Sequence, residues 1–220
     1  MAGHTFITYG QPAGFMKVFI DLFCGLGGAS EAFLGTDWKV IRIDNNRELL
    51  DHVKGMWLLD MKDPLNVIQV IRAHLYDHEV ERIVFWASPP CTEFSTKNPD
   101  RPTDGDFDMT LLENTMLVLN DLEHFYNVTD WFVENVRGAI GPFNSELGQY
   151  RQRIGPFFLW GSFVPIPCLD AEVHRHRKPF NSTNSRTPLR SNIHAKIPYA
   201  LSESLRENLD RQLSLARWVE

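Results

Sequence analysis

The chain has 220 residues, of which 43% are hydrophobic, and its formal net charge is −6. This length is enough to bury one sizeable core and leaves at most a small appendage. The longest apolar runs are far shorter than the roughly 20 residues that cross a bilayer, so no membrane partner is expected. The acidic balance counts against a protein whose whole surface binds nucleic acid.

The N-terminus and the cysteines bear on the location of the protein. Residues 1–15 lack the basic start and the apolar stretch of a secretory signal, and we interpret them as a leader or a disordered segment. Cys24, Cys91 and Cys168 are odd in number and widely spaced, which does not fit a disulfide framework. A reducing, cytoplasmic location is expected.

Strand and helix patterns alternate along the chain. Apolar runs typical of strands lie at 17–23, 38–43, 82–87 and 130–133. Helical spacing of apolar residues predicts helices at 29–34, 47–54, 65–75, 111–122 and 202–218. Such alternation predicts an α/β fold with a mostly parallel sheet, in which ligands gather beyond the carboxyl ends of the strands. Beyond Gly138 the pattern weakens into segments interrupted by proline and glycine.

The first strand ends in a glycine turn, Phe23-Cys-Gly-Leu-Gly-Gly28. Glycines let the backbone approach a ligand closely at a helix N-terminus, and Asp44 at the end of the next strand is suited to hold ribose hydroxyls. This combination suits an adenosine cofactor, although the glycines lack the spacing of dinucleotide enzymes. The alternative is a tight turn with a structural role alone.

Two further motifs follow later strands. Pro89-Pro90-Cys91 places a thiol at the tip of a loop stiffened by two prolines, although a free cysteine is more often a small buried hydrophobe. Phe132-Val-Glu-Asn135 delivers a carboxylate at a strand end, where it could equally cap a helix or end a loop in solvent. A cysteine and a carboxylate facing a cofactor pocket form an electrophile-activating pair and not a hydrolytic triad.

Together these motifs resemble those of the C5-cytosine-specific DNA methyltransferases, particularly the short forms found in phages. The segment Asp21 to Gly28 resembles the cofactor motif of that family, Ser88-Pro-Pro-Cys91 with Phe94-Ser95 its catalytic loop, and Glu134-Asn-Val136 its carboxylate motif. The order and spacing agree from Met16 to about Gly138. Gln149-Tyr-Arg-Gln-Arg153 resembles the motif that orients the base, although chance produces such a pattern in a basic segment.

The resemblance implies a Rossmann-like class I methyltransferase fold with S-adenosylmethionine as cofactor and cytosine-containing DNA as partner. It implies a catalytic domain at 16–153, a reduced target-recognition segment at 154–196 and a C-terminal helix at 197–220 that packs on the catalytic domain. The host would be a bacterium or a phage-infected cell, with a role in restriction-modification. The implied cofactor-binding residues are Phe23, Gly25, Leu26, Gly27, Gly28, Asp44, Asp60 and Pro90.

The same resemblance implies the chemistry. Cys91 would add to C6 of the base, Glu134 would hold N3 and the exocyclic amine, and Arg151 or Arg153 would bind the base oxygen. The base must be extruded or single-stranded for the thiol to reach it. The implied substrate-binding residues are Ser95, Asn135, Gln149, Arg175, Arg177 and Lys178. No metal is expected, since His174 and His176 lack a second ligand pair with zinc spacing.

The chain departs from the family pattern at several points. Thr92 follows the cysteine where glutamine is usual. The segment Ile197-Pro-Tyr-Ala-Leu201 resembles the last motif of the family, but His194-Ala195 precedes it in place of Gly-Asn. Only about forty residues are present for target recognition at 154–196, so sequence readout would be minimal or supplied by a specificity partner. A catalytically lapsed homologue that serves as a partner subunit and an RNA cytosine methyltransferase are the rival interpretations.

Two surface segments have alternative interpretations. The stretch Asn98 to Asp108, next to the cysteine, is a natural lid, although its four aspartates fit a simple crossing loop equally well. Residues 171–196 hold six basic side chains against Glu172 alone, a local charge of +5 that leaves −11 for the rest of the chain. This basic strip is a candidate for phosphate contacts, with a solvated face as the alternative.

Overall fold

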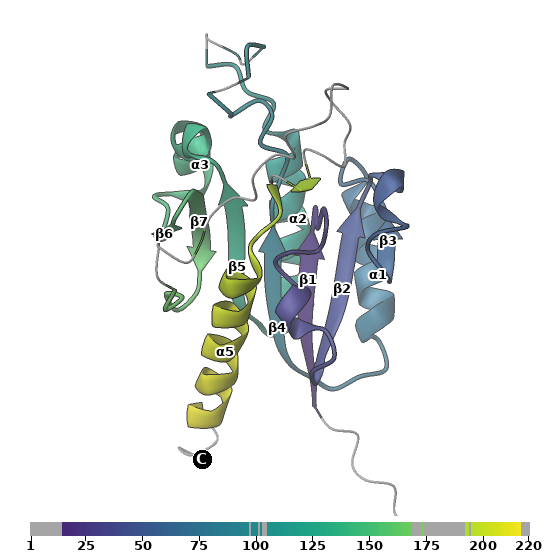
Figure 1. Ribbon diagram of the computed structural model, residues 1–220. Coiled ribbons are helices and arrows are strands. Elements are labelled where there is room, and N and C mark those ends of the chain that lie inside the picture. Colours follow the sequence, from purple (N-terminus) through teal and green to yellow (C-terminus); the bar gives the residue numbers. More distant parts are fainter. Residues whose placement is uncertain are drawn as a thin grey trace, which may run out of the picture.

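The computed structural model describes residues 15–96, 98–100, 102, 105–168, 173, 192–193 and 195–216. These residues form a seven-stranded sheet in the order β3-β2-β1-β4-β5-β7-β6 (Figure 1). The parallel strands are β1 (Met16–Leu22), β2 (Trp38–Asp44), β3 (Met56–Leu58), β4 (Val80–Ala87) and β5 (Val128–Asn135). Two further strands are antiparallel to their neighbours: β7 (Phe157–Ser162) pairs with β5, and β6 (Gln152–Ile154) pairs with β7. The predicted α/β class with a mostly parallel sheet is confirmed.

Helices cover both faces of the sheet. α1 (Pro64–Leu75) and α2 (Thr110–Phe125) lie on one face, and α5 (Tyr199–Ala216) lies on the other (Figure 1). Successive side chains of a strand point to opposite faces, so Ile20 of β1 packs toward α1 and α2 while Phe19 packs toward α5. Both residues are fully buried, which explains why the central strands are continuous apolar runs.

The predicted long helices form for local reasons. α1 begins with Pro64 at its first position, and the side chain of Asp63 accepts a hydrogen bond from the backbone N–H of Asn66. In α5, Leu201, Leu205 and Leu209 recur at a spacing of four and are buried against the sheet. No helix in the described part of the chain is long and apolar enough to cross a membrane.

Two predicted helices are wrong. The segments 29–34 and 47–54 form only the short 3₁₀ turns η1 (Glu31–Phe33) and η2 (Arg47–Leu49). Helices this short are marginal without tertiary support, and Gly35 and Gly55, with φ of 73° and 75°, lead the chain into the next strand. α5 packs over η1, where the hydroxyl of Ser202 donates to the carbonyl of Ala29.

The chain beyond Gly138 is more regular than the sequence indicated. η3 (Arg137–Ala139) leads into α3 (Ile140–Leu147), and β6 and β7 then form a hairpin. The hairpin was missed because all four residues 157–160 are buried, so β7 shows no polar alternation. Gly155, with φ of 55°, makes the tight turn that suggested irregular chain.

Candidate functional site

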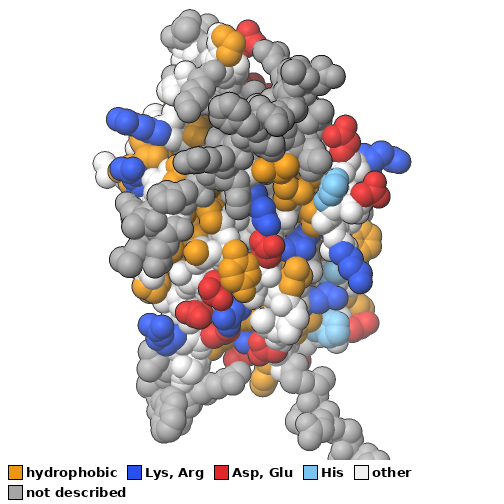
Figure 2. Space-filling model, in the orientation of Figure 1, with side chains coloured by type: hydrophobic (Ala, Val, Ile, Leu, Met, Phe, Trp, Pro, Cys, Tyr) orange, Lys and Arg blue, Asp and Glu red, His pale blue; other side chains and the backbone are white. Residues whose placement is uncertain are grey.

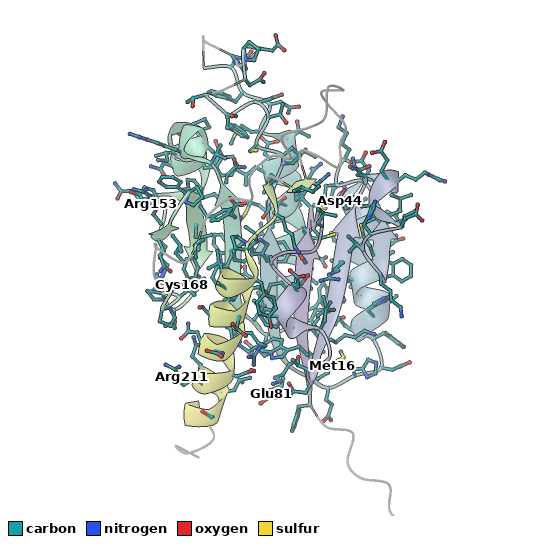
Figure 3. All side chains as sticks on the ribbon, viewed as in Figure 1. Met16, Asp44, Glu81, Arg153, Cys168 and Arg211 are labelled. Atoms are coloured by element: carbon teal, nitrogen blue, oxygen red, sulfur yellow. The ribbon has the colours of Figure 1, made fainter. Side chains whose placement is uncertain are left out.

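The carboxyl ends of four neighbouring strands meet at one edge of the sheet. The paired residues nearest this edge are Leu22 with Ile43, Leu22 with Ala87, and Ala87 with Val133. The glycine turn, Asp44, the Pro-Pro-Cys loop and Glu134 all follow directly from these positions, so the predicted convergence is confirmed. Figure 3 shows Asp44 at this edge, whereas Met16 and Glu81 lie at the opposite one.

The glycine turn is strained and tightly packed. Phe23, Gly25 and Gly27 have φ of 55°, 51° and 69°, a left-handed conformation that costs a non-glycine residue such as Phe23 about 1–2 kcal/mol. A Cβ on Gly27 would lie 2.8 Å from the guanidinium carbon of Arg42, and one on Gly28 would lie 2.4 Å from the carbonyl oxygen of Ile197. These contacts explain why glycine is needed at positions 27 and 28 without a ligand. A cofactor site at this turn is therefore supported mainly by Asp44.

Asp44 is held in place by the glycine turn. Its Oδ2 accepts a hydrogen bond of 2.9 Å from the backbone N–H of Gly25, and its Oδ1 accepts one of 2.9 Å from that of Asn46. A carboxylate offers about four acceptor sites, so two sites are left for hydroxyl donors. The second predicted carboxylate, Asp60, lies exposed after β3 and accepts from the backbone N–H of Lys62. Leu26 packs beside Cys24.

A buried polar network lies beneath the turn, and it was not found from the sequence. The hydroxyl of Ser30 donates to Asp21 Oδ2 and accepts from Arg42 Nε at 2.8 Å, while Arg42 Nη2 donates to the Gly27 carbonyl at 3.1 Å. Burial raises the pKa of Asp21 to about 6, against the lowering effects of Ser30 and Arg42. The sequence signal for this network was a charged residue inside each of two apolar strands, Asp21 in β1 and Arg42 in β2.

Hydrogen bonds fix the loop that carries Cys91. The backbone N–H of Ser88 donates to the Leu22 carbonyl at 3.2 Å, and the Asn135 amide donates to the Pro89 carbonyl at 3.0 Å. The N–H of Ser95 donates to the Cys91 carbonyl at 2.9 Å. Cys91 itself is partly exposed. Asn135 is only 1% exposed, so in this structure its amide positions the loop.

A cavity of about 570 Å³ opens beside Cys91. Its walls come from the cysteine loop, from η3 and the start of α3, and from the β6–β7 hairpin. The lining residues are Cys91, Ser95, Thr96, Val136, Arg137, Gly138, Ile140, Tyr150, Arg153, Gly155, Pro156 and Phe158. The structure thus brings three predicted residues, Cys91, Ser95 and Arg153, into one cavity.

The remaining predicted residues around this cavity lie apart from its lining. Glu134 is buried in β5 opposite Leu159 of β7, with 6% of its surface exposed. Gln149 is exposed before β6, and Pro90 is exposed at the start of the cysteine loop. The cavity has no lining residue from the glycine turn. The predicted cofactor residues and the cavity beside Cys91 therefore lie at neighbouring strand ends but do not share a wall.

The two candidate arginines are separated. The guanidinium carbon of Arg153 lies 5.7 Å from the Phe158 ring, and its Nε donates to the Gly155 carbonyl at 2.9 Å. That of Arg151 lies 5.6 Å from the ring of Phe163, which belongs to the core on the α5 face. Of the two, Arg153 is therefore the arginine beside Cys91.

The other cysteines differ from Cys91 in their surroundings. Cys24 is 7% exposed, and burial, with a further contribution from the carboxylates of Asp21 and Asp44, raises the pKa of its thiol far above the usual value. Cys168 packs against the core on the α5 face. In Figure 3 it lies beside the middle of the sheet, away from the edge that carries Asp44.

Among the cavity residues that were not predicted as site residues, two carry large polar side chains. Arg137 directly follows the carboxylate motif and is exposed, and Tyr150 precedes β6 with 38% of its surface exposed. Arg137 lies one residue beyond the carboxylate motif, and Tyr150 is an unassigned position inside the segment Gln149-Tyr-Arg-Gln-Arg153. Their place beside these motifs was the sequence signal.

Several predicted residues lie outside the described part of the chain. These are the substrate-binding candidates Arg175, Arg177 and Lys178, the pair His174 and His176, and most of the basic strip. Lys196 is described and forms an ion pair of 2.7 Å with Glu31. Where side chains are described, basic and acidic groups are interspersed on the face over α5 and η1 (Figure 2). The described residues contain no group of three metal-ligating side chains.

Only part of the Asn98 to Asp108 loop is described. At its end, the N–H of Asp108 donates to Glu93 Oε2 at 3.0 Å, which ties the loop to the segment after Cys91. The carboxylate of Asp108 accepts from the N–H of Thr110 at the start of α2. Hydrogen bonding from the Thr110 side chain, followed by that from its N–H, holds the pKa of Asp108 below its usual value. The lid interpretation stays a prediction.

Comparisons with known proteins find a distant likeness among solved structures. No protein-family model and no curated protein matches the chain. Among solved structures, it is similar to the methyltransferase EhMeth of Entamoeba histolytica, with 13% sequence identity and a TM-score of 0.40. The match covers 69% of this chain and 54% of that chain, so the chain spans about half the length of that protein. A likeness at this level identifies no function.

Proposed function

We propose that the chain is an S-adenosylmethionine-dependent DNA cytosine C5 methyltransferase that attacks the base through Cys91. The observation that carries the proposal is the strand register at the carboxyl edge. It brings the glycine turn, the cysteine loop and the Glu134 carboxylate to the ends of three adjacent strands, β1, β4 and β5. The Asn135–Pro89 hydrogen bond joins the last two of these motifs.

The residues at the β1 and β2 ends fit the proposed cofactor. Asp44 retains acceptor capacity for ribose hydroxyls, and Gly25 has a backbone conformation that a side chain would strain. Leu26, Asp60 and Pro90 would complete the site, with Asp60 near the adenine. When bound, the cofactor supplies an electrophilic methyl group on a sulfonium sulfur.

Cys91 and Arg153 of the cavity, together with Glu134 of the adjacent strand end, would carry out the base chemistry. Cytosine C5 is a poor nucleophile, and a bond from Cys91 Sγ to C6 would raise its electron density. Glu134 would hold N3 and the exocyclic amine and exchange a proton with the ring. Arg153 would bind the base oxygen through a charge-assisted hydrogen bond. After methyl transfer, loss of the C5 proton would expel the cysteine.

Target choice is expected to be lax or to depend on a specificity partner. About forty residues at 154–196 are few for a domain that reads several base edges in the major groove. Sequencing of plasmid DNA methylated by the isolated chain tests this expectation. A long and strictly obeyed target sequence would contradict it.

The proposal is tested with labelled S-adenosylmethionine and three substrates offered separately: duplex DNA, single-stranded DNA and tRNA. Nucleoside mass spectrometry should detect 5-methylcytosine in DNA. Methylation of tRNA alone would replace DNA with RNA as the substrate. Cofactor binding without transfer to any of the three would favour a catalytically lapsed partner subunit, and binding of NAD in place of S-adenosylmethionine would overturn the proposal.

A further inference from the structure

We propose that Tyr150 and Arg137 make the cavity beside Cys91 selective for an unpaired DNA strand, with Tyr150 stacking on a base and Arg137 binding a backbone phosphate. The inference rests on the proposed function and specifies the form of its substrate. A cavity of about 570 Å³ is within the range of ordinary ligand pockets and is too small for a paired duplex. Unpaired DNA avoids the cost of base extrusion, so we expect single strands to bind more tightly than duplex.

The charge of the cavity favours an anionic ligand. Arg137 and Arg153 are both exposed, and among the lining residues that the structure describes none carries a carboxylate. This is a local excess of two positive charges in a chain whose net charge is −6. Guanidinium groups bind phosphate oxygens through charge-assisted hydrogen bonds. The hydrogen bond from Arg153 to Gly155 uses one of its five N–H donors, so others are available to a base.

The orientation of Tyr150 suits it to stacking. Its ring meets the Phe158 ring at a centroid distance of 5.2 Å and an angle of 89°, and the Trp160 ring at 6.2 Å and 75°. These two edge contacts hold the ring from the side of the hairpin, while 38% of the residue remains exposed. Aromatic platforms of this kind stack on nucleobases of any sequence.

Arg137 is presented from a fixed backbone. On one side, the N–H of Val136 donates to Asn135 Oδ1 at 2.8 Å. On the other, Gly138 packs so closely on the Phe94 carbonyl that an added Cβ would lie 1.8 Å from its oxygen. The same contact holds the cysteine loop against η3. Arg137 and Cys91 therefore occupy two joined segments, which suits a cation that binds the phosphate beside the attacked base.

The test measures binding of a fluorescent oligodeoxynucleotide with one cytosine, as a single strand and as a duplex, over a series of salt concentrations. Arg137→Gln should weaken single-strand binding about tenfold and reduce the slope of log affinity against log salt by about 0.7, the value for one phosphate contact on a single strand. Tyr150→Leu should weaken binding without changing that slope. Tyr150→Phe, which keeps the aromatic ring, should bind as tightly as the parent chain. Melting temperatures establish that each variant is folded.

The matched control is Arg211→Gln, which removes the same charge from an exposed position on α5, far from this edge of the sheet (Figure 3). The inference would be overturned by equal effects of Arg137→Gln and Arg211→Gln on binding, or by an unchanged salt slope in Arg137→Gln. Duplex binding as tight as single-strand binding would also overturn it. Methyl transfer assays separate it from the proposed function. If the Arg137 and Tyr150 variants bind DNA normally and DNA is methylated, the inference is contradicted and the proposed function stands. If binding changes as expected but no methyl group is transferred, the proposed function is contradicted and the inference stands.

Discussion

The side-chain amide of Asn135 donates a hydrogen bond of 3.0 Å to the carbonyl oxygen of Pro89, so the end of β5 holds the loop that carries Cys91. The bond joins residues 46 positions apart and lies in the interior. A buried carbonyl that loses its donor bears the cost of desolvation. The position of the thiol therefore depends on a residue of the neighbouring carboxylate motif.

Asn135→Ala should lower the free energy of unfolding by about 1–3 kcal/mol, since it leaves the Pro89 carbonyl without this donor. It should also slow methyl transfer, because the cysteine loop loses an anchor. Urea unfolding and transfer rates measure the two effects. Asn208→Ala is the control, since the buried Asn208 amide donates to the Val164 and Pro165 carbonyls, outside the cavity. Equal transfer rates in both variants would contradict a positioning role for Asn135.

Gly138→Ala should destabilise the protein and slow methyl transfer. An added Cβ would meet the Phe94 carbonyl oxygen at 1.8 Å, so η3 and the cysteine loop must move apart. Gly141→Ala, three residues further on in α3, meets no atom within 4 Å and should stabilise the helix by up to about 1 kcal/mol. Thermal unfolding and transfer assays on the pair separate local crowding from a general effect of replacing glycine. Similar behaviour of the two variants would argue against the close packing of Gly138 on the Phe94 carbonyl.

Cys91→Ser should abolish methylation, and a 5-fluorocytosine substrate should trap a covalent adduct only when Cys91 is present. An alkylating reagent at neutral pH should modify Cys91 before Cys24, because burial raises the pKa of the Cys24 thiol and shields it. Peptide mapping identifies the modified residue. An adduct on Cys24 or Cys168 would show that the nucleophile is assigned incorrectly.

Asp44→Asn should weaken binding of S-adenosylmethionine about tenfold or more, equivalent to about 1.4 kcal/mol. The amide keeps one acceptor oxygen for the Gly25 N–H but loses the charge and acceptor sites proposed for ribose hydroxyls. Calorimetric titration measures the affinity. Asp51→Asn, an exposed aspartate beyond η2, is the control for the change in net charge. Unchanged affinity in Asp44→Asn would remove Asp44 from the cofactor site.

The free energy of unfolding should contain a contribution from Asp21 that is lost as the pH rises. The pKa of Asp21 is raised from 3.8 to about 6 in the folded chain, so the folded state holds this proton more tightly than the unfolded state. The contribution is present below about pH 4 and lost above about pH 6, with a magnitude of up to about 3 kcal/mol. Asp21→Asn should flatten the stability profile between pH 4.5 and 7.5 in urea titrations. A variant with the same pH dependence as the parent chain would contradict this assignment.

The sequence by itself determined the parallel strands and the motifs that follow them. Apolar runs, left-handed glycine positions and consecutive prolines act over a few neighbouring residues, so 17–23, 82–87 and the glycine turn are readable locally. Once the strands are parallel, their carboxyl ends share an edge. The placement of Asp44 and the loop of Cys91 at one edge of the sheet follows from topology alone.

Only the tertiary structure decided what surrounds Cys91. The segment 29–34 is reduced to η1, over which α5 packs, although the two lie far apart in the sequence. The β6–β7 hairpin separates Arg151 from Arg153 and brings Tyr150 to the cavity. These outcomes depend on contacts between distant residues, whose free energy overrides local preference and leaves little trace in sequence periodicity.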